Sequence, residues 1–308
     1  MSNNLHVIFG TGPVGLAIMD VLYEKGYRVR LVNRSGKTSE KLPAEVELFS
    51  GDLSDQEVAV KAAEGAVVLY NSLNPPYNKW AELFPTLQAN AIAAAEASNA
   101  KLAVIDNLYL YGEPNCQPMT ENTLHNAHTK KGKVRAQMAQ DLMAAHKAGR
   151  VQVVVGRASD FVGPRVMQST LGGDFVFKTA VAGKPARVVG DVDQPHSYTY
   201  MPDIGRALVT LAENEDAFGQ VWHLPTPPAI STQKTLEMIY DAAGHPLKMQ
   251  VAPKWLLRLM GFFNSDAAEM VEMVYEFEQP FTIDDSKFVN RFGWQATELD
   301  VAIKETVA

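Results

Sequence analysis

The stretch LHVIFGTGPVG at residues 5–15 decides the fold, because an apolar run there meets three closely spaced glycines. Leu5 to Phe9 has the length and apolarity of a short buried strand. Val14 to Lys25 has the apolar spacing of a helix, and Gly26 suits the turn that ends it. The chain is therefore expected to open with a strand, a glycine-rich turn and a helix.

Strand and helix signals keep alternating through the first half of the chain. Further strands are expected at residues 28–33, 46–49, 66–71, 102–107 and 151–156, and helices at 54–64, 80–98 and 131–147. Such alternation predicts an α/β fold with a Rossmann, doubly wound parallel sheet that carries helices on both faces. Nearly continuous apolar runs such as residues 151–155 are typical of strands that are buried on both sides.

After Pro164 the pattern becomes irregular, and glycines and prolines interrupt it often. We expect a Rossmann domain over residues 1–165 and a smaller substrate-binding lobe over residues 166–308. Residues 196–224 are expected to return to the first domain, with a helix at 203–213 and a strand at 220–224. A further helix is expected at 231–243.

Composition limits the compartment and the partners. The chain has 308 residues, a formal net charge of −7 and one cysteine, Cys116. The negative balance argues against a nucleic-acid partner, and a lone cysteine cannot form an internal disulfide, which favours a reducing compartment. No apolar run reaches the roughly 18 residues that span a bilayer, and no secretory signal is recognisable. We therefore expect a cytoplasmic protein without a membrane partner, and no histidine spacing suggests a metal site.

The glycines form a G-x-G-x-x-G pattern that follows a strand and opens a helix. In dinucleotide-binding folds the first glycine permits the turn, the second lets a pyrophosphate approach and the third lets the helix pack on the strand. The helix N-terminus adds free N–H groups and a positive dipole end. A glycine-rich turn without a ligand is the alternative. We expect a dinucleotide diphosphate to bind at Gly10, Thr11, Gly12, Pro13, Val14 and Gly15.

The end of the second strand bears on which dinucleotide binds. An acidic residue there usually bonds the ribose 2′-hydroxyl of NAD, but this chain has Asn33, Arg34 and Ser35. A guanidinium offers several donors and a fixed charge to a 2′-phosphate. The sequence therefore favours NADP(H) over NAD(H), unless Arg34 is only a solvated surface charge.

Short motifs after the later strands carry a family resemblance. They are GDL at 51–53, NSL at 71–73, YG at 111–112, RAS at 157–159, YMPDIGRA at 200–207 and FGW at 292–294. In their order and spacing the chain resembles the extended short-chain dehydrogenase/reductase family. That group contains sugar-nucleotide epimerases, dehydratases and dihydroflavonol-reductase-like enzymes. The resemblance covers essentially the whole chain, although Phe9 stands where the family usually has its first glycine.

The resemblance implies roles for the matched residues. Asp52 and Leu53 would contact the adenine, and the lobe after Pro164 would hold a small-molecule substrate. The helices at 80–98 and 131–147 would pair in a homodimer. The residues that would line the cofactor path, the last two of them near the nicotinamide, are Asn71, Ser72, Leu73, Ala158 and Ser159.

The catalytic positions depart from the family pattern. The family uses a Ser or Thr, then a Tyr and a Lys four residues apart, and the aligned positions here hold Asn107, Lys131 and Arg135. Asn107 would polarise a carbonyl, and Arg135 would bind ribose hydroxyls. Lys131 would act as acid or base if burial and Arg135 lowered its pKa.

Other readings of these residues stay open. Lys131 also belongs to a basic cluster with Lys130 and Lys133, and such clusters are usually solvated. Further acid–base candidates from nearby parts of the chain are Tyr109, Tyr111, His125, His128, His196 and Tyr200.

Three functions are compatible with these observations. The first is an NADP(H)-dependent oxidoreductase that acts on a small carbonyl or alcohol through an unusual proton donor. The second is an NAD-dependent sugar-nucleotide epimerase or dehydratase, which family membership alone implies. The third is a dinucleotide-sensing or scaffold protein that kept the fold and lost the chemistry.

Overall fold

The computed structural model describes residues 4–115, 117–167, 169, 171, 175–252 and 271–307. Cys116 lies outside these described residues. The chain divides into two units: unit 1 holds residues 1–106, 133–157 and 204–222, and unit 2 holds 107–132, 158–203 and 223–308. The sequence predicted one domain boundary at residue 165 and a return of residues 196–224 to the first domain. The division by contacts runs differently, because the segments that follow Asp106 and Arg157 both pack within unit 2.

Unit 1 is built on a seven-stranded sheet in the order β11-β6-β5-β4-β1-β2-β3. Its strands are β1 (Leu5–Phe9), β2 (Arg28–Asn33), β3 (Glu47–Ser50), β4 (Ala66–Asn71), β5 (Lys101–Asp106), β6 (Val153–Arg157) and β11 (Val221–His223). From β3 through β6 every neighbouring pair runs parallel, which confirms the predicted Rossmann sheet. Strand order reverses between β1 and β4, and ligands of open α/β sheets bind at the carboxyl ends of strands at such a point.

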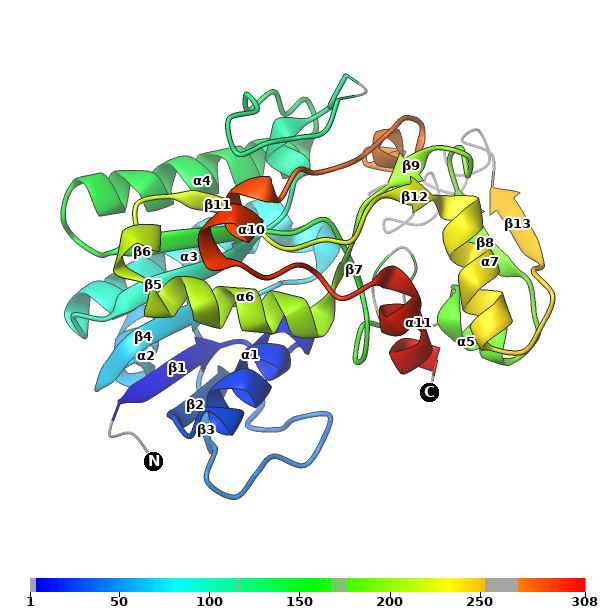
Figure 1. The fold of residues 1–308 in the computed structure, drawn as a ribbon. Coiled ribbons are helices and arrows are strands. Elements are labelled where there is room, and N and C mark those ends of the chain that lie inside the picture. Colours follow the sequence, from blue (N-terminus) through cyan, green and yellow to red (C-terminus); the bar gives the residue numbers. More distant parts are fainter. Residues whose placement is uncertain are drawn as a thin grey trace. The chain divides into compact units, whose positions relative to one another are not determined.

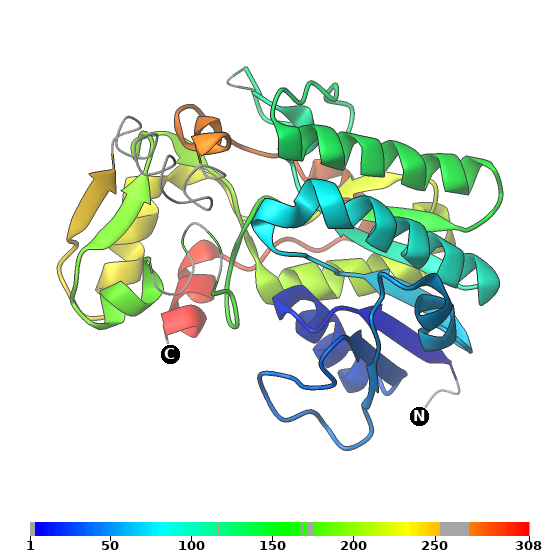
Figure 2. The ribbon, with the colours of Figure 1, turned by 180° about the vertical axis from the view of Figure 1, so that it is seen from behind.

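Helices cover both faces of this sheet (Figures 1 and 2). They are α1 (Pro13–Glu24), α2 (Gln56–Ala62), α3 (Trp80–Ala97), α4 (Lys130–Lys147) and α6 (Met201–Glu213), with 3₁₀ turns η1 (Tyr77–Lys79) and η3 (Glu215–Ala217). α1 and α6 lie on one face, and α2, α3 and α4 on the other. α6 approaches α1 closely, because a Cβ on Gly205 would lie 2.5 Å from the Ala17 carbonyl oxygen.

The core of unit 1 lies between the sheet and these helices. Every residue of β1 and of β6 is buried, as expected for strands covered on both sides. The core includes Val7, Phe9, Leu69, Leu102 and Val155 from the strands, and small alanines from α2 and α3 pack against them. A buried sheet of this kind fixes the strand ends, and so it fixes the residues that follow them.

Unit 2 contains short elements with their own apolar core. They are η2 (Tyr109–Tyr111), β7 (Asp160–Val162), α5 (Phe177–Val181), β8 (Ala186–Val189), β9 (Pro195–His196), β10 (Tyr198–Tyr200), β12 (Ile230–Ser231), α7 (Thr232–Ala242), β13 (Met249–Ala252), η4 (Val274–Phe277), α10 (Ser286–Phe292) and α11 (Leu299–Val307). The strands pair as β10-β7, β12-β9 and β13-β8. Leu236, Ile239 and Tyr240 of α7 pack with Ala302 and Ile303 of α11 in this core.

The described part of the chain has neither a membrane-spanning helix nor a metal-binding cluster of side chains. None of the helices there is both long and apolar enough to cross a membrane. Within the same residues, no group of three or more His, Cys, Asp or Glu side chains is placed to hold a metal ion.

Candidate functional site

The glycine turn of unit 1 connects β1 to α1 at the reversal point of the sheet. Gly10 has φ +108°, which favours glycine, and a Cβ on it would lie 2.9 Å from Ser72 Oγ. A Cβ on Gly15 would lie 2.2 Å from the Gly10 carbonyl oxygen. Packing within the protein therefore requires glycine at the first and third positions of the motif.

Gly12 differs from these two, because a Cβ there would meet no atom within 4 Å among the described residues. Its φ of −75° is open to any residue. Gly12 is the N-cap of α1 and has no side-chain cap, and Pro13 occupies the first turn. The first N–H groups of α1 thus have no side-chain cap at Gly12, and the positive end of a helix is the kind of site that binds phosphates.

The carboxyl end of β4 lies beside this turn. Ser72 Oγ donates to the Phe9 carbonyl oxygen at 2.9 Å, and the Ser72 N–H donates to the same oxygen at 3.0 Å. Asn71 Oδ1 accepts from the Leu73 N–H at 3.3 Å. Residues 71–73 are thus held next to the glycine turn within unit 1, as expected for a cofactor path.

The loop after β2 is organised by Asn33. Its Nδ2 donates to Thr11 Oγ1 at 2.8 Å and to the Lys37 carbonyl oxygen at 2.7 Å, and its Oδ1 accepts from the Gly36 N–H at 2.7 Å. Asn33 thereby joins this loop to the glycine turn. Arg34 and Ser35 remain exposed beside it, where a bound ribose phosphate would have access to them.

Asp52 and Leu53 follow β3 in the same unit. Asp52 Oδ1 accepts from the Ser54 N–H at 3.0 Å and from Ser54 Oγ at 2.8 Å. These bonds lower the pKa of Asp52, with a smaller contribution in the same direction from Arg34. The Leu53 side chain is buried, and its carbonyl oxygen accepts from Asn90 Nδ2 at 2.9 Å.

Lys131 occupies the first turn of α4, and its surroundings belong to unit 2. The side chain is only 3 % exposed, so it is not part of a solvated cluster, whereas Lys130 and Lys133 are exposed. Glu272 Oε1 accepts from the Lys131 backbone N–H at 3.1 Å and lies 3.4 Å from Lys131 Nζ. Burial lowers the pKa of Lys131, and Glu272 opposes that shift. The cation that adds to the lowering is Lys130 rather than the expected Arg135.

Arg135 follows one turn later, and its guanidinium contacts residues of unit 1. It lies 3.6 Å from Asp106 Oδ1, and its Cζ stands 4.5 Å from the ring centre of Trp80 and 4.1 Å from that of Phe84. Arg157 Nε donates to Asp106 Oδ2 at 3.1 Å, across the β5–β6 register. The Arg135 charge thus lies against Asp106 within unit 1.

Asp106 and Arg157 are site candidates that the sequence analysis did not select. Each is the last residue of its strand, and both are buried. A carboxylate with two guanidiniums at the carboxyl ends of β5 and β6 gives a rigid charged group where ligands of such sheets bind. The sequence signal that could have identified these two residues is their place at the ends of two apolar strands, which pair in register.

The remaining predicted cofactor and catalytic residues lie in unit 2. Asn107 Oδ1 accepts from the Tyr109 N–H at 3.2 Å. Ala158 and Ser159 are buried, and the Ser159 N–H donates to Thr199 Oγ1 at 3.1 Å. Ser159 Oγ is buried without a hydrogen-bond partner in the described part of the chain. A buried hydroxyl of this kind could receive a polar group of a ligand.

The alternative acid–base candidates have different surroundings. Tyr111 is buried and its hydroxyl lies 2.8 Å from His223 Nε2, while His125 and His128 are exposed. Tyr200 is buried in the core of unit 2 and bonds Glu305. His196 Nε2 lies 2.9 Å from Asp160 Oδ2, and its ring stacks on Phe277 at 4.7 Å. The sequence had no sign of this Asp160 contact.

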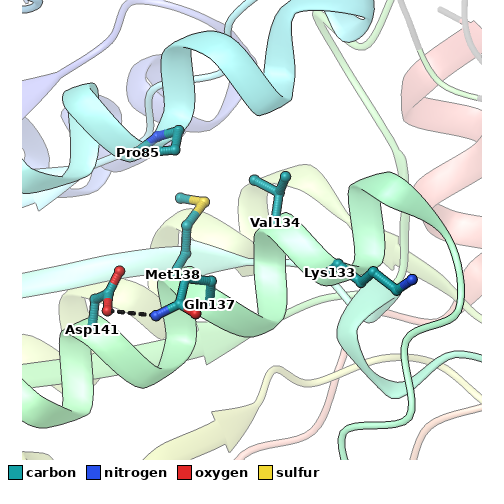
Figure 3. Close-up of a pocket in the computed structure, with 6 residues that line it drawn as sticks. All are labelled: Pro85, Lys133, Val134, Gln137, Met138 and Asp141. Atoms are coloured by element: carbon teal, nitrogen blue, oxygen red, sulfur yellow. Dashed lines mark hydrogen bonds between the residues drawn. The ribbon is translucent and has the colours of Figure 1, made fainter.

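One groove lies within unit 1 between α3 and α4, and Figure 3 shows it. Its volume is about 270 Å³, and its lining residues are Pro85, Lys133, Val134, Gln137, Met138 and Asp141. Gln137 Nε2 donates to Asp141 Oδ1 at 2.9 Å. Val134 and Met138 point from α4 toward α3, so the groove is mainly apolar between a lysine and an aspartate.

Comparison with known proteins agrees with this fold. The chain is 23 % identical over 275 residues to a UDP-glucose 4-epimerase of Corynebacterium glutamicum, covering 81 % of this chain and 83 % of that protein. It superposes on a dTDP-glucose 4,6-dehydratase of Bacillus anthracis, solved with NAD, with a TM-score of 0.80 and 14 % identity over 99 % of this chain and 95 % of the other. A UDP-glucose 4-epimerase of Thermotoga maritima gives a TM-score of 0.79 and 17 % identity over 98 % and 97 % of the two chains.

The sequence profile of one family matches residues 7–224, which include the glycine turn, Asn107, Lys131 and Ser159. These residues make up well over half of the chain. The match confirms the resemblance to extended short-chain enzymes and the expectation of a dinucleotide-dependent enzyme. The chain belongs to the NAD dependent epimerase/dehydratase family.

Proposed function

We propose that this protein removes and returns a hydride and a proton at a hydroxyl-bearing carbon of a nucleotide-linked sugar, with a nicotinamide dinucleotide bound in unit 1. Family membership supports the reaction class. Proteins similar to this chain are named as UDP-sugar epimerases and dTDP-glucose dehydratases. This proposal prefers a sugar-nucleotide substrate to the small carbonyl or alcohol that the sequence favoured.

The observation that carries the proposal is the buried amine of Lys131, which Glu272 contacts. By the sequence resemblance, Lys131 stands where the family has its tyrosine. A reaction that oxidises a hydroxyl needs a group that takes the hydroxyl proton and later gives it back. A desolvated lysine can do this, because burial lowers its pKa from the ordinary value and so makes the neutral amine easier to form. The amine therefore replaces the phenol as the proton carrier.

Other residues bind and orient. The first N–H groups of α1 and the open space at Gly12 would hold the diphosphate, and the dinucleotide when bound supplies the hydride acceptor and donor. Ser159 Oγ would bond its carboxamide. Asn107 would direct its amide toward the reacting oxygen, and Arg135 would meet ribose hydroxyls from a guanidinium that Asp106 orients.

The test uses purified protein with NAD⁺ or NADP⁺ and four substrates: UDP-glucose, UDP-galactose, UDP-N-acetylglucosamine and dTDP-glucose. Products are separated by anion-exchange chromatography. We expect conversion of at least one, and Lys131→Met should lower it by about 100-fold or more. Dinucleotide binding without conversion of any nucleotide sugar contradicts the proposal. If Lys131→Met leaves a measurable activity unchanged, the amine does not carry the proton.

A second function is favoured by the exposed Arg34 and Ser35 after β2. Their donors suit the 2′-phosphate of NADP(H), and NADPH commonly serves reduction. We therefore propose NADP(H) as the preferred dinucleotide, and NADPH-dependent reduction of a small carbonyl as the alternative activity. A panel of aldehydes and ketones with NADPH tests it, with absorbance at the reduced nicotinamide band as the readout.

We also propose that the partner of this chain is a second copy of itself, joined through α3 and α4. The groove there is mainly apolar. Lys133 lies four residues before Gln137 in the sequence, and Asp141 lies four residues after it. A two-fold axis through Gln137 would set each Lys133 opposite the Asp141 of the other copy. A cytoplasmic location is part of the same proposal, supported by the single cysteine.

A further inference from the structure

Glu272 is a residue that no sequence motif selected, and it makes two contacts with Lys131. One carboxylate oxygen, Oε1, accepts from the backbone N–H at 3.1 Å and lies within 3.4 Å of the side-chain Nζ. The residues are 141 positions apart in the chain. Both belong to unit 2, so their contact is a feature of one body.

The backbone contact makes Glu272 a cap of α4. The first N–H groups of a helix have no partner inside the helix, and a carboxylate there also meets the positive dipole end. Thr129 Oγ1 caps the same end by accepting from the Gly132 N–H at 3.0 Å. Among the described residues, Thr129 and Glu272 both cap this helix end, and the Glu272 cap carries charge and reaches the amine.

The segment that carries Glu272 is held in place by its neighbours. The Asp191 N–H donates to the Phe277 carbonyl oxygen at 2.7 Å, and a Cβ on Gly190 would lie 2.4 Å from that oxygen. The ring of Tyr275 meets that of His128 at 4.9 Å. Residues 128–131 and 272–275 therefore meet at two points, which fixes the carboxylate against the amine.

We propose that Glu272 is the positioning residue of Lys131: it orients the amine and sets the pH at which that amine gives up its proton. This inference rests on the proposed function for its catalytic meaning. Among the described residues, charged groups that act on the amine include Glu272, which favours the ammonium, and Lys130, which disfavours it together with burial. When a substrate hydroxyl loses its proton, the O–H bond breaks, an N–H bond forms at Nζ, and the new ammonium is held by the carboxylate.

Two variants separate charge from capping. Glu272→Gln keeps an acceptor oxygen and nearly the same shape but loses the charge. Thr129→Ala removes the other cap and leaves both charges in place. The position of the Lys131 titration is measured by NMR of the ε-CH₂ carbon in lysine-labelled protein, assigned by its loss in Lys131→Arg.

We expect Glu272→Gln to move the Lys131 titration midpoint to lower pH, and Thr129→Ala to lower the melting temperature without moving that midpoint. An unchanged midpoint in Glu272→Gln overturns the proposal, as does an equal shift in both variants. Glu272→Asp keeps the charge, so its Lys131 midpoint should lie between the midpoints of Glu272→Gln and of the unaltered protein.

Because the NMR titration needs no substrate, it separates this inference from the proposed function. If the midpoint shifts but no nucleotide sugar is converted, the proposed function fails and the positioning of the amine by Glu272 stands. If turnover is found, its pH profile in Glu272→Gln should move in the same direction as the midpoint, with kcat changed more than KM. A pH profile that stays in place while the midpoint moves would falsify a role for this pair in the reaction.

Discussion

Gly12 and Gly15 lie in the same turn, but the protein needs them for different reasons. A methyl group at Gly15 would overlap the Gly10 carbonyl oxygen at 2.2 Å, whereas one at Gly12 would project into open space. Gly12→Ala should therefore keep the melting temperature and weaken dinucleotide binding about tenfold or more, which is about 1.4 kcal/mol. Gly15→Ala should lower stability by about 1–3 kcal/mol. Thermal unfolding and fluorescence titration with NADPH check the pair.

The outcome that contradicts this division is a Gly12→Ala protein that binds dinucleotide as well as the unaltered chain does. The open space at Gly12 would then not be where the diphosphate lies.

Arg34 gives a second prediction for a single residue. It is exposed beside Asn33, where a 2′-phosphate would meet its guanidinium. Arg34→Ala should weaken NADP⁺ binding about tenfold and leave NAD⁺ binding nearly unchanged, as measured by calorimetric titration with each dinucleotide. Arg28→Ala, at the other end of the same strand, is the matched control and should change neither. Equal losses for the two dinucleotides would assign Arg34 a general electrostatic role.

Sequence reasoning at this scale succeeded where the partners are local. The glycine turn is readable because its three positions lie within six residues, and Gly10 and Gly15 each have a separate steric reason. Lys131 resembled a solvated cluster because its partner Glu272 is 141 residues away. Asp106 and Arg157 were missed for the same reason, since strand register brings them together across 51 residues.

At the level of elements, β1 carries a buried histidine in an otherwise apolar strand. Burial lowers the pKa of His6 from 6.5 to about 4, and its Nδ1 lies 3.3 Å from the Tyr70 hydroxyl. A histidine with a depressed pKa in the folded state stays neutral there while the unfolded chain takes up a proton. The free energy of unfolding should therefore fall as pH drops from 6.5 to about 4, by about 3 kcal/mol, and His6 should contribute no slope above that window.

His6→Phe should remove that part of the pH dependence, because phenylalanine suits the Tyr27 and Tyr70 rings and does not titrate. Urea unfolding at a series of pH values measures it. His245→Ala, at an exposed histidine, serves as the control and should keep the slope. A slope that survives in His6→Phe assigns it to other groups.

Helices and strands were predictable where the sequence has a simple apolar pattern. The strands at 5–9, 28–33 and 66–71 were expected with the bounds that the structure has, because they are short apolar runs between turns. The helix ends in the structure differ from the expected ends by one or two residues, as at α2, where Asp55 supplies the cap. The many short elements of unit 2 were not expected, since strands of two to four residues leave no period to detect.

For the whole molecule, the proposed two-fold pairing through α4 makes a charge-swap prediction. Lys133→Asp would place two carboxylates opposite each other in the paired copies and should shift sedimentation toward the monomer. Lys133→Asp combined with Asp141→Lys restores opposite charges and should recover the dimer. Analytical ultracentrifugation at low and high salt measures both. A monomeric wild-type chain at micromolar concentration, or a double variant no better than the single one, contradicts the pairing.

Because unit 1 takes one of its two edge strands, β11, from a late part of the chain, that edge of the sheet stays incomplete until two separate stretches of unit 2 have been synthesised. While a growing chain is still on the ribosome, β6 is made well before the strand that will cover it. During that interval the backbone of β6 offers an unpaired edge to any neighbouring nascent chain. A fragment that ends near residue 165 would keep this edge exposed, and we expect it to aggregate more readily than the full chain.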